Sequence, residues 1–264
     1  MINIKFKNCF SLIFLCVIFV LFFNEINFAQ VKDLNLKFGK NIFKTKFNSE
    51  EYTTTLSIFS EDEKIFEETY YDLIPEIARM DLDNDGKKEY LIAMYSGGAH
   101  CCTNLFTGKI SNGKFSYTDT ISWGNSFFKA EDLNSDGKTE IAGINDVYAY
   151  MFTNYAQSRF PVLIYGYENK RFVNVTAKFP KQINENLTDL LKELDEYKDF
   201  TCEESGTETF NTEAGAVKAI LAAATEDYML LGRVEEGYKL INEFYKCPDR
   251  DSFKDTLRIR FLLK

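Results

Sequence analysis

Two acidic, glycine-containing segments repeat in the sequence, and they carry its clearest chemistry. Residues 81–89 read DLDNDGKKE (loop 1) and residues 132–140 read DLNSDGKTE (loop 2). Both have oxygen-bearing side chains at positions 1, 3 and 5, glycine at position 6 and glutamate at position 9. The candidate ligands are Asp81, Asp83, Asp85 and Glu89 in loop 1, and Asp132, Asn134, Asp136 and Glu140 in loop 2.

This pattern suits a hard divalent cation. Calcium binds six to eight oxygen atoms, and a tight loop lets alternate side chains point inward while a backbone carbonyl at position 7, here Lys87 or Lys138, adds a further ligand. Glycine at position 6 permits the sharp turn. Without a cation the crowded carboxylates would repel one another. The sequence therefore predicts Ca²⁺ as the cofactor of both loops.

Two other interpretations of these loops are available. Each loop read alone is also compatible with a solvated, Asp- and Gly-rich hairpin turn. The helix-loop-helix calcium site requires glutamate at position 12, where this chain has Ile92 and Gly143, and helices on both sides. Here strand-like runs follow the loops instead, YLIAMY after loop 1 and IAGI after loop 2. We therefore expect each loop to connect two strands.

The region around the loops is rich in short β-branched and aromatic runs separated by turn residues, from about Phe38 to Phe179. This spacing favours antiparallel hairpins. Examples are the runs that begin at Tyr52, Glu89, Lys114, Pro161 and Arg171.

Together, the loops and their flanking strands, residues 77–95 and 127–144, resemble the FG-GAP or VCBS repeat of integrin α-subunit propellers and many exported bacterial proteins. The resemblance implies calcium-stabilised blades of about four antiparallel strands, used in adhesion and in carbohydrate or protein recognition. Two loops are too few for a complete propeller, and residues 38–71 form a third unit at most, without a calcium loop. We expect two to three blade-like units in an open or sandwich-like assembly.

Helical periodicity replaces the strand pattern from Ile183 onward. Asn211 is a candidate N-cap, Gly232 a helix stop, and residues 248–251 a break before the last helix. Apolar residues recur at helical spacing in three stripes, at Leu187, Leu190, Leu191 and Leu194, at Val217, Ile220, Leu221 and Ala224, and at Tyr238, Ile241 and Phe244. The predicted fold class is thus α+β, with an antiparallel β region over residues 31–180 and a small helical unit of four helices over residues 183–264.

The N-terminus has the pattern of a signal peptide. Lys5 and Lys7 precede a 15-residue apolar run, residues 9–23, with a candidate cleavage site after Ala29. An uncleaved anchor is the alternative. The run is shorter than a membrane-spanning helix, and no later segment approaches that length. We expect a mature chain, beginning after residue 29, that has no membrane span and is secreted, periplasmic or at the cell surface.

Composition narrows the class of partner. The chain has 264 residues, a formal charge of −9, 45% hydrophobic residues and a single histidine. The negative charge disfavours nucleic-acid binding through a basic surface. Calcium and a protein or carbohydrate ligand are the predicted partners. Trp123, Tyr148, Tyr150 and Tyr155 are candidate loop aromatics for stacking on such a ligand, and the alternative, more common for such residues, is that they are partly buried and pack in the fold.

Four cysteines follow the predicted cleavage site, as expected for disulfides in an oxidising compartment. We favour a pair between Cys202 and Cys247, which bracket a helical stretch. Cys101 and Cys102 are adjacent, and either form a vicinal disulfide or remain buried thiols.

The segment SGGAHCC, residues 96–102, is similar to one in exported bacterial proteins that carry the same calcium loop. His100 with a neighbouring cysteine would offer a nucleophile pair or a soft-metal site, but we favour a glycine-enabled structural turn. The sequence thus predicts an exported calcium-binding protein for recognition or scaffolding, without catalysis. The alternatives are a secreted hydrolase, using acidic residues or the His100 segment, and an inhibitor or accessory subunit that docks through its helices.

Overall fold

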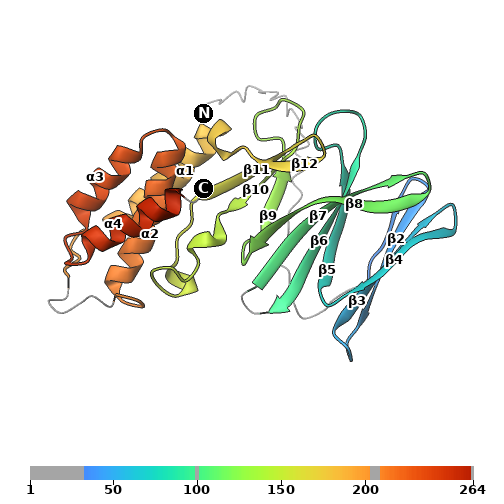
Figure 1. Ribbon diagram of the computed structural model, residues 1–264, viewed down its shortest axis with the longest axis horizontal. Coiled ribbons are helices and arrows are strands. Elements are labelled where there is room, and N and C mark those ends of the chain that lie inside the picture. Colours follow the sequence, from blue (N-terminus) through green and yellow to red (C-terminus); the bar gives the residue numbers. More distant parts are fainter. Residues whose placement is uncertain (1–32, 99–100, 203–208, 263–264) are drawn as a thin grey trace, which may run out of the picture. The chain divides into compact units, whose positions relative to one another are not determined.

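The computed structural model describes residues 33–98, 101–202 and 209–262, which belong to one compact unit and form an α+β fold (Figure 1). The first sheet contains β1 (Asn35–Phe38), β2 (Asn41–Asn48), β3 (Thr53–Ser60) and β4 (Glu63–Tyr70). The second contains β5 (Leu73–Met80), β6 (Glu89–Gly98), β7 (Cys101–Ser111) and β8 (Lys114–Gly124). The third contains β9 (Phe128–Glu131), β10 (Glu140–Ile144), β11 (Val162–Glu168) and β12 (Arg171–Asn174). The helices are α1 (Pro180–Asp195), α2 (Glu213–Leu230), α3 (Val234–Phe244) and α4 (Arg250–Leu262), with short 3₁₀ turns η1 (Asp146–Tyr148), η2 (Tyr155–Gln157) and η3 (Thr176–Lys178).

Each sheet is an antiparallel meander in which sequence neighbours pair as spatial neighbours. The predicted hairpins are confirmed, and the stretch predicted as a third unit, residues 38–71, supplies three strands of a third sheet, whose first strand is Asn35–Phe38. That sheet has only two residues, Gly39 and Lys40, between its first two strands, whereas the other two sheets have an acidic loop there. Whether the sheets are propeller blades stays a prediction.

Strand β6 lies between two apolar cores because its side chains alternate between its two faces. Tyr90, Ile92 and Met94 join a cluster with first-sheet residues such as Phe43. Leu91 and Ala93 join a second cluster with third-sheet residues. A strand that is buried on both faces reads as a continuous hydrophobic run, as YLIAMY does. The second sheet is therefore the central layer of the β region.

One face of the first sheet is covered with paired polar groups. The hydroxyls of Thr55 and Thr69 are 2.9 Å apart, and the Ser57 hydroxyl donates to Glu67 Oε2 at 2.8 Å. Lys64 Nζ also donates to that carboxylate at 2.6 Å, and all these groups are exposed. A hydrogen-bonded polar surface of this kind is suited to water.

The helix boundaries differ from the prediction at three N-termini, one of which is that of α4, which begins at Arg250 inside the predicted break over residues 248–251. Helix α1 begins at Pro180 and not at Ile183, because proline suits the first turn, where its missing N–H costs nothing. Helix α2 is capped by Thr212, whose hydroxyl accepts from Gly215 N at 3.3 Å, and not by Asn211. The predicted stop at Gly232 is confirmed: its φ of +73° is the left-handed conformation that ends helices after their last turn.

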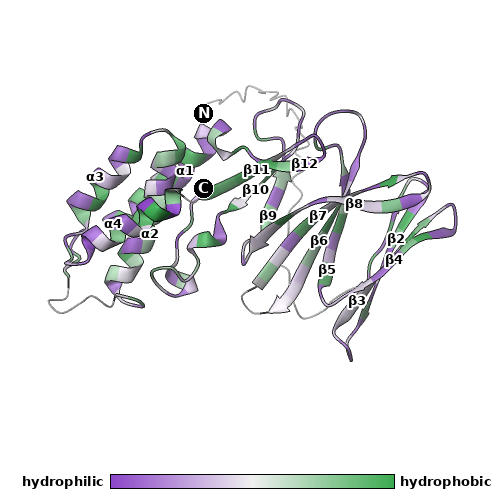
Figure 2. Ribbon diagram, in the orientation of Figure 1, coloured by the Kyte–Doolittle hydropathy of each residue, from purple (hydrophilic) through white to green (hydrophobic). Residues whose placement is uncertain are grey.

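Helix α2 is the core of the helical part. The predicted apolar stripe of this helix is buried, and so is every other residue from Ala214 to Asp227, so the helix is covered on all sides. Helices α1 and α3 and the segment around Tyr148 pack on it. Several of its buried residues are alanines, whose small side chains belong to the same core cluster. Figure 2 shows α3, by contrast, banded in hydrophilic and hydrophobic colours, as expected for a helix with one buried face.

The described residues include the predicted disulfide between Cys202 and Cys247, which are 45 residues apart. Cys102 is also disulfide-bonded, but the side chain of Cys101 lies outside the described residues, so their vicinal pairing stays a prediction. The predicted signal peptide and His100 lie outside the described residues as well. In the part of the chain that is described, no helix is both long and apolar enough to span a membrane.

Candidate metal centre

The two acidic loops occupy the same place in successive sheets. Loop 1 connects β5 to β6 and loop 2 connects β9 to β10, so each joins the first and second strands of its sheet. The strand-loop-strand setting predicted from the sequence is confirmed. It separates these loops from the helix-loop-helix calcium site, which requires helices on both sides.

The aspartate at position 1 organises each loop through its own backbone. In loop 1, Asp81 accepts from Asp85 N at 3.1 Å and from Gly86 N at 2.9 Å. In loop 2, Asp132 accepts from the equivalent amides at 3.1 and 2.8 Å. These bonds curve the backbone around the carboxylate. They use one lone pair of each oxygen and leave the others available.

Left-handed backbone geometry repeats at positions 4 and 6. Asn84 and Ser135 have φ values of +60° and +63°, and the glycines that follow two residues later have φ of +81° and +85°. Only glycine adopts this conformation without strain, and asparagine tolerates it better than most residues. The glycine at position 6 is therefore required by the loop conformation itself.

The glutamate at position 9 closes each loop by accepting from the backbone amide of the leucine at position 2. Leu82 N donates to Glu89 Oε2 at 3.2 Å, and Leu133 N donates to Glu140 Oε2 at 3.0 Å. Burial raises the pKa of both glutamates, the leucine amides lower it, and the neighbouring aspartates raise it again. Each loop thus has a partly desolvated carboxylate beside other acidic groups, a setting that a cation would relieve.

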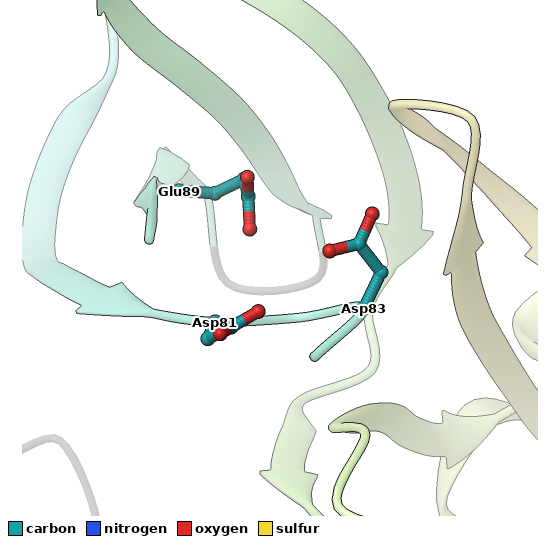
Figure 3. Close-up of side chains that lie close together, drawn as sticks. All are labelled: Asp81, Asp83 and Glu89. Atoms are coloured by element: carbon teal, nitrogen blue, oxygen red, sulfur yellow. The ribbon is translucent and has the colours of Figure 1, made fainter. Parts of the chain in front are cut away.

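Loop 1 gathers three carboxylates around one space. Oxygen atoms of Asp81, Asp83 and Glu89 lie within 4.8 Å of one another, and all three residues are half-buried. Figure 3 shows the carboxylates of Asp83 and Glu89 facing the same space beside the stretch of loop that carries Asp81. Asp83 Oδ1 is buried and has no hydrogen-bond partner among the described residues. An orphaned carboxylate oxygen beside two other carboxylates fits a hard cation such as Ca²⁺.

The fourth acidic residue of loop 1, Asp85, is held by its neighbour. Its Oδ1 accepts from Lys87 N at 2.7 Å, and this bond lowers the pKa of the Asp85 carboxyl. Lys87 Nζ is 3.3 Å from Oδ2 of the same group. The structure therefore places Asp85 outside the carboxylate trio, and the predicted roles of Asp85 and of the Lys87 carbonyl as ligands stay predictions.

Loop 2 has the same backbone but is closed on itself at positions 3 and 5. Asn134 Oδ1 accepts from Asp136 N at 3.0 Å, and Asn134 Nδ2 donates to Asp136 Oδ2 at 3.2 Å. Lys138 N donates to the other Asp136 oxygen at 2.9 Å. Among the described residues, no acidic trio forms here like that of loop 1. The predicted ligands of loop 2 therefore do not gather around one space as those of loop 1 do, because the Asn134 side chain is hydrogen-bonded to Asp136.

The two loops are also in contact with each other, although they are 51 residues apart in the sequence. Thr139 N donates to Leu82 O at 3.1 Å. A Cβ atom placed on Gly137 would lie only 2.6 Å from Asn84 Nδ2. The leucine repeated at position 2 was the available signal, because Leu82 is fully buried in the core between the second and third sheets and so fixes loop 1 against loop 2.

The four loop aromatics divide between the two roles considered for them, packing in a core and stacking on a ligand. Trp123 and Tyr148 are each 1% exposed and belong to apolar cores, so neither presents a ring to a ligand. Tyr150 is 43% exposed, and its ring centroid is 5.7 Å from that of Tyr155. Of the residues proposed for stacking, only this tyrosine pair reaches the surface.

Comparison with known proteins gives one relative and no family. No protein-family model matches the chain. The sequence is 30% identical over 181 residues to a probable thylakoid lumen protein from Synechocystis sp. strain PCC 6803. The match covers 67% of this chain and 48% of the relative, so the chain spans about half the length of the curated relative that it matches.

Proposed function

We propose that the chain is an exported calcium-binding protein of the FG-GAP or VCBS type, whose role is recognition of a protein or carbohydrate, or scaffolding, without catalysis. The observation that carries the calcium proposal is the trio of Asp81, Asp83 and Glu89, in which one buried carboxylate oxygen has no hydrogen-bond partner in the described part of the chain. The repeated hydrogen-bond pattern of loop 2 supports a second site. Ca²⁺ bound there would neutralise the loops and fix the strands that they join.

Export is supported by two separate observations. The relative from Synechocystis is described as a probable thylakoid lumen protein, and a lumenal protein has to cross a membrane. The Cys202–Cys247 disulfide is a bond typical of exported proteins. With the basic and apolar N-terminal sequence, these observations support secretion or a periplasmic or cell-surface location.

Calcium-dependent stability tests this function. Extracellular calcium modules have dissociation constants of ~10⁻⁴ to 10⁻³ M. At 10 mM Ca²⁺ a site in this range stabilises the folded state by about 1.4 to 2.7 kcal/mol. For a protein of this size that corresponds to a rise in melting temperature of roughly 3 to 10 °C per site. We expect this rise in differential scanning calorimetry, and its reversal by chelator.

Asp83→Ala is the sharpest variant for this test, because Asp83 Oδ1 makes no hydrogen bond among the described residues and its removal breaks none. We expect the variant to lose the loop 1 share of calcium stabilisation while keeping its melting temperature in chelator. Asp189→Asn, at an exposed position of α1, is the control with the same change in charge. Equal calcium responses in wild type and Asp83→Ala would refute a cation at loop 1.

A further inference from the structure

The contact between the loops links their two proposed ligand sets through the backbone of one residue, Leu82. The Leu82 amide donates to Glu89 Oε2, a loop 1 carboxylate, while the Leu82 carbonyl accepts from Thr139 N. Thr139 immediately precedes Glu140, the carboxylate that closes loop 2. A continuous path of hydrogen bonds and peptide bonds therefore runs from Glu89 to Glu140. The Leu82 side chain, buried in the core, restrains the backbone on both sides of its Cα.

A second contact lies at the outer part of the loops. Asn84 Nδ2 is so close to Gly137 that a methyl group on this glycine would collide with it at 2.6 Å. Asn84 lies directly after Asp83, and Gly137 directly after Asp136. Movement of loop 1 around a cation thus changes the space available to the residues at positions 5 and 6 of loop 2.

The loops differ in how ready they are for a cation. Loop 1 already has three carboxylates around one space, whereas loop 2 has its Asn134 side chain paired with Asp136. A cation in loop 2 must break the hydrogen bonds between Asn134 and Asp136. This step has a free-energy cost that cation binding to the loop 1 trio does not have. Loop 1 is therefore the stronger site, and any ordering that it imposes on loop 2 lowers the cost of filling the second.

We propose that the two loops bind calcium as a coupled pair, in which a cation in loop 1 raises the affinity of loop 2 through the Leu82–Thr139 hydrogen bond and the Asn84–Gly137 contact. This inference rests on the proposed function and adds a regulation of the same sites. Coupling between binding sites is reciprocal, and values of 5- to 150-fold in affinity are typical. Coulomb repulsion between the two cations opposes this coupling, and salt screens that repulsion only in part because the loop 1 carboxylates are half-buried.

Isothermal titration of the purified chain with CaCl₂ tests the coupling, with Asn84→Gly as the key variant. Glycine accepts the φ of +60° at this position, so the variant removes the contact with Gly137 and retains the loop 1 carboxylates. We expect the wild type to bind two ions. In Asn84→Gly we expect the affinity of the first ion to change less than about twofold and that of the second to fall about fivefold.

Ser135→Gly is the matched control, because Ser135 is at the same loop position with φ of +63°. It makes the same backbone change within loop 2 without touching the Asn84 contact, and we expect less than a twofold change for either ion. Asp83→Ala, which disables loop 1, should weaken calcium binding at loop 2 by at least about fivefold relative to the second ion of the wild type. Melting curves in chelator verify that all variants fold.

The outcomes separate this inference from the proposed function. Two ions with unchanged second-ion affinity in Asn84→Gly would overturn the coupling and leave calcium binding intact. Only one ion in the wild type, lost in Asp83→Ala, would also overturn the coupling while keeping loop 1 as a site. No calcium heat in any variant at millimolar concentration would overturn both.

Discussion

Replacing Asp227 with asparagine should stabilise the protein at neutral and alkaline pH. Asp227 is fully buried in helix α2 and accepts a hydrogen bond from Asn186 Nδ2 at 2.6 Å. Burial raises the pKa of its carboxyl from the ordinary 3.8 to about 7, against the smaller lowering effects of Asn186 and the Val162 amide. The folded protein therefore holds this proton at a pH where the unfolded chain has released it.

The sign and size follow from proton linkage. Between about pH 4 and pH 7 the folded state binds more protons at Asp227 than the unfolded state does, so this group's contribution to stability falls as pH rises. Each pKa unit corresponds to about 1.4 kcal/mol, so the full loss above pH 7 is roughly 4 kcal/mol. Asparagine has no charge to desolvate, and its carbonyl can still accept from Asn186.

Urea denaturation followed by circular dichroism, at pH values from 4.5 to 8.5, measures this effect as the difference between variant and wild type. We expect Asp227→Asn to be close to wild type at pH 4.5 and more stable by roughly 2 to 4 kcal/mol at pH 8. Asp189→Asn, on the exposed face of α1, is the control and should show no such trend. A pH-independent difference, or a variant that is less stable at pH 8, would refute the reasoning.

Two further changes probe the helical part. Replacing Cys202 and Cys247 together with alanine opens a closed loop of 46 residues, since the cysteines are 45 apart, and should cost about 4 kcal/mol of unfolding free energy in the chain-entropy model. Guanidinium denaturation checks this value, and an unchanged midpoint would contradict it. Gly237→Ala should destabilise by about 1 to 3 kcal/mol, although alanine is the better helix former, because its Cβ would lie 2.8 Å from Thr225 Cγ2 and 2.9 Å from Thr225 Cα. A melting temperature of Gly237→Ala above that of the wild type would show that α2 and α3 move apart without a loss of stability.

The local features of the acidic loops could be predicted from sequence because neighbouring residues determine them. Each loop conformation depends on contacts within nine residues, chiefly those of the glycine at position 6 and the aspartate at position 1. The structure has both residues in the predicted turn between two strands. The same holds for Gly232 at the end of α2 and for the Cys202–Cys247 pair, which the segregation of cysteines between strand-rich and helical regions indicated.

Burial in the third dimension was not predictable in the same way. Trp123 and Tyr148 lie in polar-looking stretches, yet both are in apolar cores because segments distant in sequence cover them. Helix α2 has an apolar stripe, but it is buried on every side because three other helices and the segment around Tyr148 share it. Periodicity reports one preferred face and does not report how many neighbours a helix has.

By itself, the sequence determined the fold class, the strand-loop-strand setting and the candidate ligands of each loop. Only the tertiary structure decided that Thr139 of loop 2 reaches Leu82 of loop 1. It also decided that, among the residues described, an Asp83 oxygen has no hydrogen-bond partner whereas the Asn134 side chain is paired with Asp136. The reason is physical: a turn's conformation depends on dihedral preferences and hydrogen bonds within a few residues. The approach of two turns 51 residues apart depends on how their sheets pack, and Leu82, buried between those sheets, sets that distance.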